Sequence, residues 1–319
     1  MRGDAPLHTE LSGVPAGGAA FWTRAEDGTR LRFALWQGGT RGTVLLFPGR
    51  TEYIEKYGLV VERLMSFGLS IVVIDWRGQG LSDRPIPGKS IGYVEDFAEY
   101  QSDLAAVLGH EMVASLPGPR LLMAHSMGGC IGLRALLSGL DVAGSVFSAP
   151  MWGINLPLAP LSRAVITLGA RIGFAKAFAP MTGGTTLVLA AKKPEGNPLT
   201  TDLDVFRRLQ DHARAVPELT LGGASFGWLS AAFRETAALA EAEPAKGPIL
   251  TFLGTEERIV EAEPIHRQSG RQPHAELVLC EGAQHEIWME RPETQAPVWE
   301  RIEAFLGAHL GPTPTAGDD

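Results

Sequence analysis

Ser126 is the residue whose sequence context most clearly indicates chemistry. Small residues stand two positions before and two positions after it, at Ala124 and Gly128, in the pattern small-x-Ser-x-Gly. An apolar run at residues 120–124 leads into this motif, and a helix-like segment at residues 130–140 follows it. In that context the pattern predicts a sharp strand-to-helix turn that exposes the serine hydroxyl at a helix N-terminus as a nucleophile. The alternative is a glycine-rich turn with an incidental serine.

A serine hydroxyl needs a neighbouring base to remove its proton. Among the eight histidines, His285 fits this role because it follows the apolar run at residues 275–280 on a loop. His266 stands in a polar, helix-like segment and His309 near the C-terminal end, which predicts surface positions for both. His125 adjoins the serine, but its side chain should point elsewhere in such a turn, so we predict a role in packing or hydrogen bonding.

The base in turn needs an acid that orients it. The apolar run at residues 249–253 is followed by a loop that contains Glu256 and Glu257. Either carboxylate would complete the chain order Ser, Glu, His, which is an order found in serine hydrolases. The alternative is a pair of solvated surface carboxylates.

Predicted strands and helices alternate along the chain, and these elements must position the candidate residues. Two alternating apolar runs flank Asp27-Gly28 and predict a β-hairpin. Helical patterns at residues 53–67, 94–116 and 292–310 lie between short continuous apolar runs of the kind buried on both faces of a parallel sheet. This alternation predicts an α/β protein with a doubly wound, mostly parallel sheet. The predicted buried strands are residues 43–47, 69–74, 120–124, 144–147, 249–253 and 275–280.

Residues 152–234 interrupt the alternation. They read as helical material with Gly and Pro breaks and without a clear buried strand, and we interpret them as a lid inserted over the sheet. The predicted organisation is therefore a core (1–151), the lid (152–234), the second part of the core (235–310) and a disordered tail (311–319).

The composition excludes several functional classes. The chain of 319 residues has a formal net charge of −8, which argues against a nucleic-acid binder because such proteins need a basic face. Two cysteines without a Cys/His cluster predict neither a disulfide framework nor a zinc site. We find no signal-peptide pattern and no stretch of the roughly 18 apolar residues that a membrane helix needs. These features predict a cytoplasmic protein.

Five short motifs follow five of the predicted strands: LFPGRTE (46–52), DWRGQGLS (75–82), AHSMGG (124–129), GTEERIV (254–260) and GAQHE (282–286). With these motifs the sequence resembles the serine α/β-hydrolases grouped around bacterial lysophospholipases and monoacylglycerol lipases, over residues 31–310. The resemblance implies the α/β-hydrolase fold with an inserted helical lid. It also implies a reaction that needs no metal and no organic cofactor.

The resemblance assigns further roles. The family's acid stands three residues after the glycine that ends its strand, which is Glu257 here, where monoacylglycerol lipases have Asp. Glu256 stays a second candidate. The family's His-Gly oxyanion motif appears as Pro48-Gly49, and the match implies that the backbone N–H groups of Arg50 and Met127 form the oxyanion hole.

The motifs also contain two charged side chains and one loop whose roles we interpret separately. The side chain of Arg50 would either bind a phosphate or carboxylate, or form an ion pair between loops. Glu52 opens the following helix and is expected to favour its N-terminus. The segment 75–82 is interpreted as a structural loop without a catalytic role.

The lid carries an unusual charge distribution. Residues 151–194 contain five cations and no Asp or Glu, with apolar residues interleaved. Such a segment could rest on anionic lipid or admit an acyl chain, whereas the alternative is a lid whose apolar face covers the core and whose cations are solvated. Trp152, Phe226 and Trp228 would line the pocket or simply pack the lid. The five cations are Arg163, Arg171, Lys176, Lys192 and Lys193.

Together these observations predict a serine carboxyl-ester hydrolase that releases a fatty acid from a lysophospholipid or monoacylglycerol through an acyl-enzyme. The predicted partners are a small lipid or ester substrate and, through the lid, the membrane periphery, without nucleic acid. A small-ester, lactone or peptide-type hydrolase is the nearest alternative. A non-catalytic, hydrolase-like ligand receptor is the alternative from another class.

Overall fold

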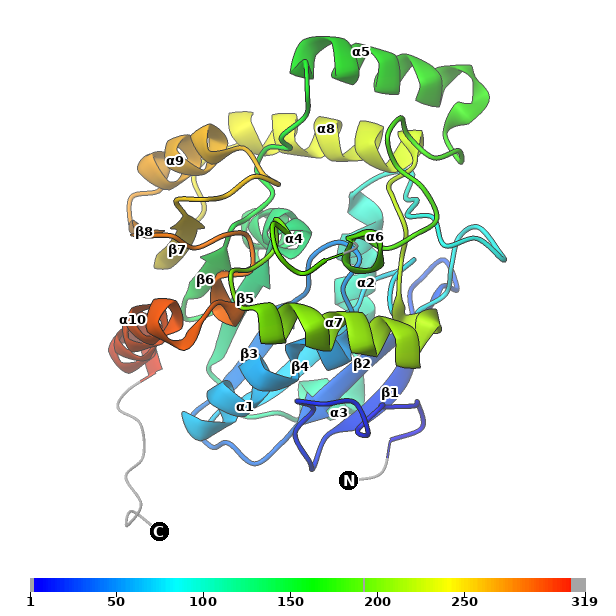
Figure 1. The fold of residues 1–319 in the computed structure, drawn as a ribbon. Coiled ribbons are helices and arrows are strands. Elements are labelled where there is room, and N and C mark those ends of the chain that lie inside the picture. Colours follow the sequence, from blue (N-terminus) through cyan, green and yellow to red (C-terminus); the bar gives the residue numbers. More distant parts are fainter. Residues whose placement is uncertain (1–2, 192, 311–319) are drawn as a thin grey trace.

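An eight-stranded sheet runs through the molecule, in the strand order β1-β2-β4-β3-β5-β6-β7-β8 (Figure 1). The computed structural model describes residues 3–191 and 193–310, so the predicted tail at 311–319 lies outside the described residues. β1 and β2 pair antiparallel, β2 is antiparallel to β4, and the other neighbouring strands are parallel. The strands are β1 (Ala19–Arg24), β2 (Arg30–Trp36), β3 (Thr43–Phe47), β4 (Ser70–Asp75), β5 (Arg120–His125), β6 (Ser145–Ser148), β7 (Ile249–Gly254) and β8 (Ala275–Cys280).

The predicted fold class is confirmed, and the apolar runs explain why. Every residue of β3 and β4 is buried, because these central strands have neighbours on both edges and helices on both faces. The edge strand β8 is only partly buried. The predicted hairpin is also present: Gly28 adopts a φ of +85°, and the N–H of Thr29 donates to Oδ1 of Asp27 at 3.0 Å.

Helices connect the parallel strands and cover the sheet (Figure 1). α4 packs against β3 and β5, α1 against β4, and α9 and α10 against β7. The helix predicted over 94–116 is two helices, because His110 caps a new one by accepting the N–H of Met112. The helices outside the inserted segment are η1 (Ile54–Tyr57), α1 (Gly58–Ser66), α2 (Ala98–Leu108), α3 (Glu111–Ala114), α4 (Met127–Leu137), α9 (Ala262–Arg271), η4 (Ile287–Met289) and α10 (Pro292–Leu310).

The segment between β6 and β7, which is predicted to be a lid, packs in more than one place. α5 lies against α8, on the side of α8 that faces away from the sheet, at the top of Figure 1. α7 instead reaches the N-terminal segment, where His212 Nε2 lies 3.0 Å from the carbonyl oxygen of Ser12. The boundary predicted at Arg234 falls inside α8, which continues to Glu241 because its helical pattern is unbroken. The inserted helices are α5 (Ala159–Gly169), η2 (Ala170–Phe174), α6 (Leu187–Ala190), α7 (Leu203–Ala215), η3 (Pro217–Leu219) and α8 (Phe226–Glu241).

Candidate active site

Ser126 occupies the turn between β5 and α4, where the sequence pattern places it. Its φ of +51° and ψ of −118° lie in a region that non-glycine residues rarely adopt, at a cost of about 1–3 kcal/mol. The turn is also tight, because a Cβ atom at Gly128 would lie 2.1 Å from the carbonyl oxygen of Phe47. This backbone holds Ser126 at the N-terminus of α4, where free N–H groups and the helix dipole favour developing negative charge.

His285 and Glu257 form a buried pair. Nδ1 of His285 lies 2.7 Å from Oε2 of Glu257, and both side chains are almost fully buried. The other oxygen, Oε1, accepts the backbone N–H groups of Ile259 at 2.6 Å and Val260 at 3.1 Å. Burial opposes ionisation of Glu257, but the charge of His285 and these hydrogen bonds hold its pKa below the ordinary value. An ionised Glu257 therefore fixes Nδ1 and leaves Nε2 as the nitrogen for proton transfer.

The other candidates for acid and base lie elsewhere. The side chain of Glu256 is exposed and lies 3.2 Å from Nη2 of Arg258, so the structure brings Glu257, not Glu256, to the histidine. His266 is exposed on α9, as the sequence predicts, and His309 is half-buried near the end of α10. The choice between the two adjacent glutamates depends on which carboxylate the loop turns toward the amides of Ile259 and Val260.

Ser126 and His285, the predicted nucleophile and base, both line a cavity of about 800 Å³. Of the three pocket residues expected from the sequence, Trp228 lines the cavity, but Trp152 and Phe226 are absent from the walls that the described residues form. Trp152 is buried against the core, where its indole N–H donates to the carbonyl of Gly129 at 3.3 Å. Phe226 instead packs its ring against Phe174 and Gly169 of the α5–η2 segment. Most of the remaining wall is apolar and comes from the inserted segment, including Leu156, Leu161, Val165, Ile166 and Leu187.

The two predicted oxyanion donors stand on well-fixed backbone. Met127 is the first residue of α4, so its N–H has no partner within the helix. Gln79 holds the loop on both sides of Arg50: its Nε2 donates to the carbonyl of Gly49 at 3.0 Å, and its Oε1 accepts the N–H of Thr51 at 2.7 Å. The segment 75–82 is predicted to be a structural loop without a catalytic role, and Gln79 supports the loop around Arg50 in this structural way.

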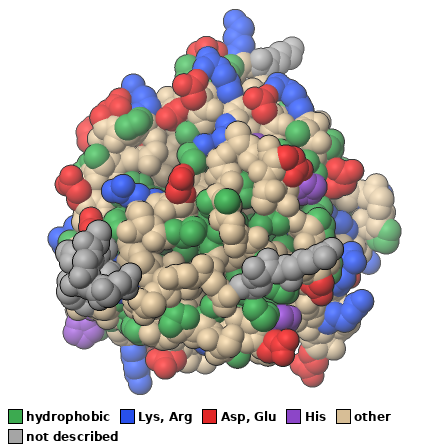
Figure 2. Space-filling view, turned by 90° about the horizontal axis from the view of Figure 1, so that it is seen from below, with side chains coloured by type: hydrophobic (Ala, Val, Ile, Leu, Met, Phe, Trp, Pro, Cys, Tyr) green, Lys and Arg blue, Asp and Glu red, His purple; other side chains and the backbone are tan. Residues whose placement is uncertain are grey.

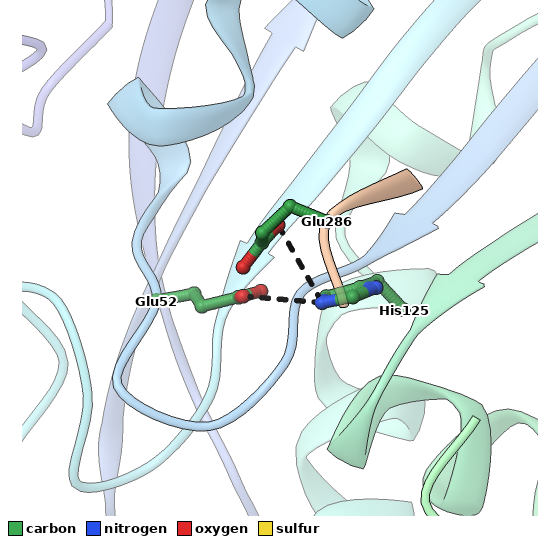
Figure 3. Close-up of side chains that lie close together, drawn as sticks. All are labelled: Glu52, His125 and Glu286. Atoms are coloured by element: carbon green, nitrogen blue, oxygen red, sulfur yellow. Dashed lines mark ion pairs between the residues drawn. The ribbon is translucent and has the colours of Figure 1, made fainter. Parts of the chain in front are cut away.

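A cluster of buried charged side chains surrounds His125, whose ring packs against His285. Figure 3 shows the carboxylates of Glu52 and Glu286 directed at His125, whose Nε2 lies 3.6 Å from Glu52 and 3.5 Å from Glu286. Lys56 binds both carboxylates, at 2.5 Å and 2.6 Å. The ring centroids of His125 and His285 are 4.6 Å apart. Nδ1 of His125 lies 3.1 Å from the carbonyl oxygen of Ser148, and its ring packs on His285, so His125 has the hydrogen-bonding and packing role predicted for it. Glu52 is part of this cluster rather than a helix-terminal charge.

Lys56 links the loop that carries Gly49 and Arg50 to the loop that carries His285 and Glu286. Glu52 accepts the N–H of Gly49 in the first loop, and Glu286 directly follows His285 in the second. Burial penalises the Lys56 ammonium, but the two carboxylates more than offset this and raise its pKa. Glu52, His125 and Glu286 lie close enough together to act as metal ligands, but Lys56 already supplies the positive charge that both carboxylates need.

The Lys56→Met substitution is expected to lower the free energy of unfolding by about 3–5 kcal/mol, because it leaves two buried carboxylates without a cation. Urea denaturation measures the change. Lys246→Met makes the same chemical change at an exposed lysine and should alter stability by less than about 0.5 kcal/mol. Equal effects of the two substitutions would contradict the assigned role of Lys56.

Comparisons with known proteins identify the family. The family model described as serine aminopeptidase, S33, matches residues 38–292, a range that contains Ser126, Glu257 and His285. The chain belongs to this family. Lysophospholipase L2 of Escherichia coli is 28% identical in an alignment of 288 residues that covers 85% of this chain and 82% of that protein. Monoacylglycerol lipase of Mycolicibacterium smegmatis is 32% identical over 106 residues, 33% of this chain and 36% of that protein.

Solved structures agree with the fold. The monoacylglycerol lipase of Paleococcus ferrophilus superposes with a TM-score of 0.70 at 23% identity, covering 88% of this chain and 99% of that chain. This structure supports the predicted fold. The S33 family match and the lysophospholipase and monoacylglycerol lipase relatives confirm the predicted resemblance and the predicted enzyme class, a serine hydrolase acting on esters.

Proposed function

We propose that this S33-family chain is a carboxyl-ester hydrolase that releases a fatty acid from a lysophospholipid or a monoacylglycerol. The observation that carries the proposal is the buried pair of His285 and Glu257, in which His285 lines the same cavity as Ser126. A binding protein would not need a serine in a strained turn beside such a pair, so this arrangement disfavours the ligand-receptor alternative.

In the proposed reaction, Oγ of Ser126 attacks the ester carbonyl while Nε2 of His285 takes its proton. Glu257 holds the imidazole and stabilises the imidazolium that forms. The N–H groups of Arg50 and Met127 bind the oxyanion, and each such donor contributes about 3–4 kcal/mol to transition-state stability. His285 then protonates the leaving alcohol, and water releases the fatty acid from the acyl-enzyme. These groups supply all of the required chemistry, so the proposed reaction involves no metal or organic cofactor.

Two observations support a lipid ester over other substrates. The cavity has mostly apolar walls and a volume of about 800 Å³, which suits an acyl chain. The similar proteins include a lysophospholipase and monoacylglycerol lipases. Because the family is described as serine aminopeptidase, a peptide-type hydrolase is the second candidate function, together with a hydrolase of small esters or lactones.

Chain-length profiling tests this substrate class. We expect kcat/KM for p-nitrophenyl esters to rise from acetyl to octanoyl and decanoyl, by about tenfold or more, because each additional buried methylene contributes about 0.8 kcal/mol. The Ser126→Ala variant measures the uncatalysed background. A sharp preference for acetyl would favour the small-ester alternative, and turnover of amino-acid amides in place of esters would favour the peptide-type one.

We also propose that the α5–η2 segment contacts the membrane periphery. Several large apolar side chains are exposed there, and so are two cations, Arg171 within η2 and Lys176 just after it. The opposite face of the molecule, by contrast, carries acidic and basic side chains interspersed around its edge (Figure 2). Within residues 3–191 and 193–310 no helix is long and apolar enough to cross a membrane. The exposed apolar residues of the segment are Leu158, Leu161, Val165, Leu168, Ile172 and Phe174.

Vesicle binding tests this contact. Wild-type protein should co-sediment with vesicles of phosphatidylglycerol and phosphatidylcholine more strongly than with phosphatidylcholine alone. The double change Leu168→Ser and Ile172→Ser should weaken partitioning about tenfold or more, because both side chains would enter the acyl boundary. Leu59→Ser with Leu279→Ser removes two exposed leucines outside the segment and should have little effect. Equal losses for the two double variants would contradict the proposal.

Both cysteines, Cys130 and Cys280, are free and buried. Buried free thiols suit a reducing compartment, which supports the proposed cytoplasmic placement.

A further inference from the structure

Arg50 has an environment that its backbone role does not explain. Its side chain lines the cavity together with Ser126 and His285. Nη2 donates to the carbonyl of Gly222 at 2.9 Å, and the guanidinium lies 4.9 Å from the ring centroid of Trp228. Nε is buried and has no hydrogen-bond partner. Among the described residues, no carboxylate lies within ion-pair distance of this guanidinium.

The cavity therefore contains an uncompensated positive charge. The described residues that line it include two cationic side chains, Lys56 and Arg50. Lys56 is neutralised by Glu52 and Glu286, whereas Arg50 meets only a carbonyl oxygen and an aromatic face. Burial lowers the pKa of Arg50 to about 10, so it still carries its charge at neutral pH. The Arg50 side chain is half-buried, with its Nε fully buried. A partly desolvated cation without a counterion is unfavourable, and an anionic ligand group would relieve that cost.

The position of Arg50 limits where such an anion can lie. Its backbone N–H is the proposed oxyanion donor, so the ester carbonyl of the substrate would lie next to the backbone of Arg50. The guanidinium is one arginine side chain away from that point. In a lysophospholipid, the ester and the phosphate are separated by a glycerol unit, which is of comparable length. Guanidinium groups also match the geometry of phosphate oxygens by donating two parallel hydrogen bonds.

We propose that the side chain of Arg50 binds the phosphate of a lysophospholipid substrate while its backbone N–H binds the ester oxyanion. This inference rests on the proposed ester-hydrolase function and narrows it, because it selects the phosphate-bearing lipid over the monoacylglycerol. Arg50 then acts as a specificity-determining residue. Free glycerol phosphates should compete with the substrate for this phosphate-binding site.

The test compares two substrates that differ only in the phosphate, 1-decanoylglycerol and 1-decanoylglycerol 3-phosphate, below their critical micelle concentrations. Wild-type enzyme should favour the phosphate ester in kcat/KM. Arg50→Gln should reduce that ratio about tenfold or more, because it removes a charge-assisted hydrogen bond from a desolvated site. Arg50→Lys keeps a charge but loses the planar fork, so it should retain part of the preference.

Arg84→Gln is the matched control. Arg84 also links a core loop to the inserted segment through carbonyl oxygens, those of Gly78 and Thr220, but it does not line the cavity. Its loss should affect both substrates equally and leave the ratio unchanged. If Arg50→Gln behaves in the same way, Arg50 merely ties the inserted segment to the core and the proposal is overturned.

A second measurement uses only wild-type protein, in case Arg50→Gln does not fold. Glycerol 3-phosphate should inhibit hydrolysis of the monoacylglycerol competitively, and glycerol at the same concentration should not. Equal inhibition by the two compounds, or by neither, would overturn the phosphate site. Hydrolysis of neither decanoyl substrate by the wild type would instead contradict the proposed function itself.

Discussion

Replacing Ser126 by Ala is expected to lower kcat for ester hydrolysis by about 10⁶-fold, the scale on which loss of a serine nucleophile acts in a triad. The reason is that no acyl-enzyme can form without Oγ, although the cavity and the oxyanion donors remain. Alanine also fits the tight turn, so the variant should fold. Steady-state hydrolysis of p-nitrophenyl octanoate measures the loss, and mass spectrometry of the quenched wild-type reaction should detect the acyl adduct.

Ser138→Ala provides the control, since this serine is exposed at the end of α4 and lies outside the cavity. Its activity should stay within about twofold of wild type. If Ser126→Ala retained activity within tenfold of wild type, another nucleophile would have to be sought.

Replacing Glu257 by Gln is expected to lower kcat by about 10⁴-fold while leaving the fold intact. Gln could still accept the N–H groups of Ile259 and Val260 through its carbonyl oxygen. Its NH₂ group would then face Nδ1 of His285 and force the proton onto Nε2, the nitrogen that must accept the proton of Ser126. The variant therefore has the wrong tautomer and no charge to stabilise the imidazolium. A thermal melt beside the kinetics separates this effect from loss of folding.

Glu256→Gln is the matched control at the adjacent position, where the carboxylate is exposed and pairs with Arg258. It should change kcat by less than about twofold, because exposed ion pairs contribute little. An equal loss in the two variants would mean that the acid is not specifically Glu257.

The sequence predicts the parts of this molecule that local pattern controls. The buried strands appear as continuous apolar runs, and the steric limits at Ala124 and Gly128 identify the nucleophile turn. The loop after β7 offers two adjacent glutamates of the same chemistry. Only its folded backbone, which turns one of them toward the amides of Ile259 and Val260, decides between them.

Other features depend on contacts between distant segments and leave no local signal. Lys56 and Glu286 stand 230 residues apart, and no spacing rule relates them. Gln79 supports the oxyanion loop through two hydrogen bonds that its own motif does not suggest. Trp152 was expected in the pocket, but a tryptophan near an active site is equally suited to the core when its N–H finds a carbonyl such as that of Gly129.

The central claim is that Ser126 is the activated nucleophile of an esterase. Labelling with a fluorescent fluorophosphonate, which reacts only with an activated serine, tests it most directly. Wild-type protein should be labelled stoichiometrically, with the adduct on the peptide that contains Ser126, and Ser126→Ala should not be labelled. Failure of correctly folded wild-type protein to react, or undiminished labelling of Ser126→Ala, would contradict the claim.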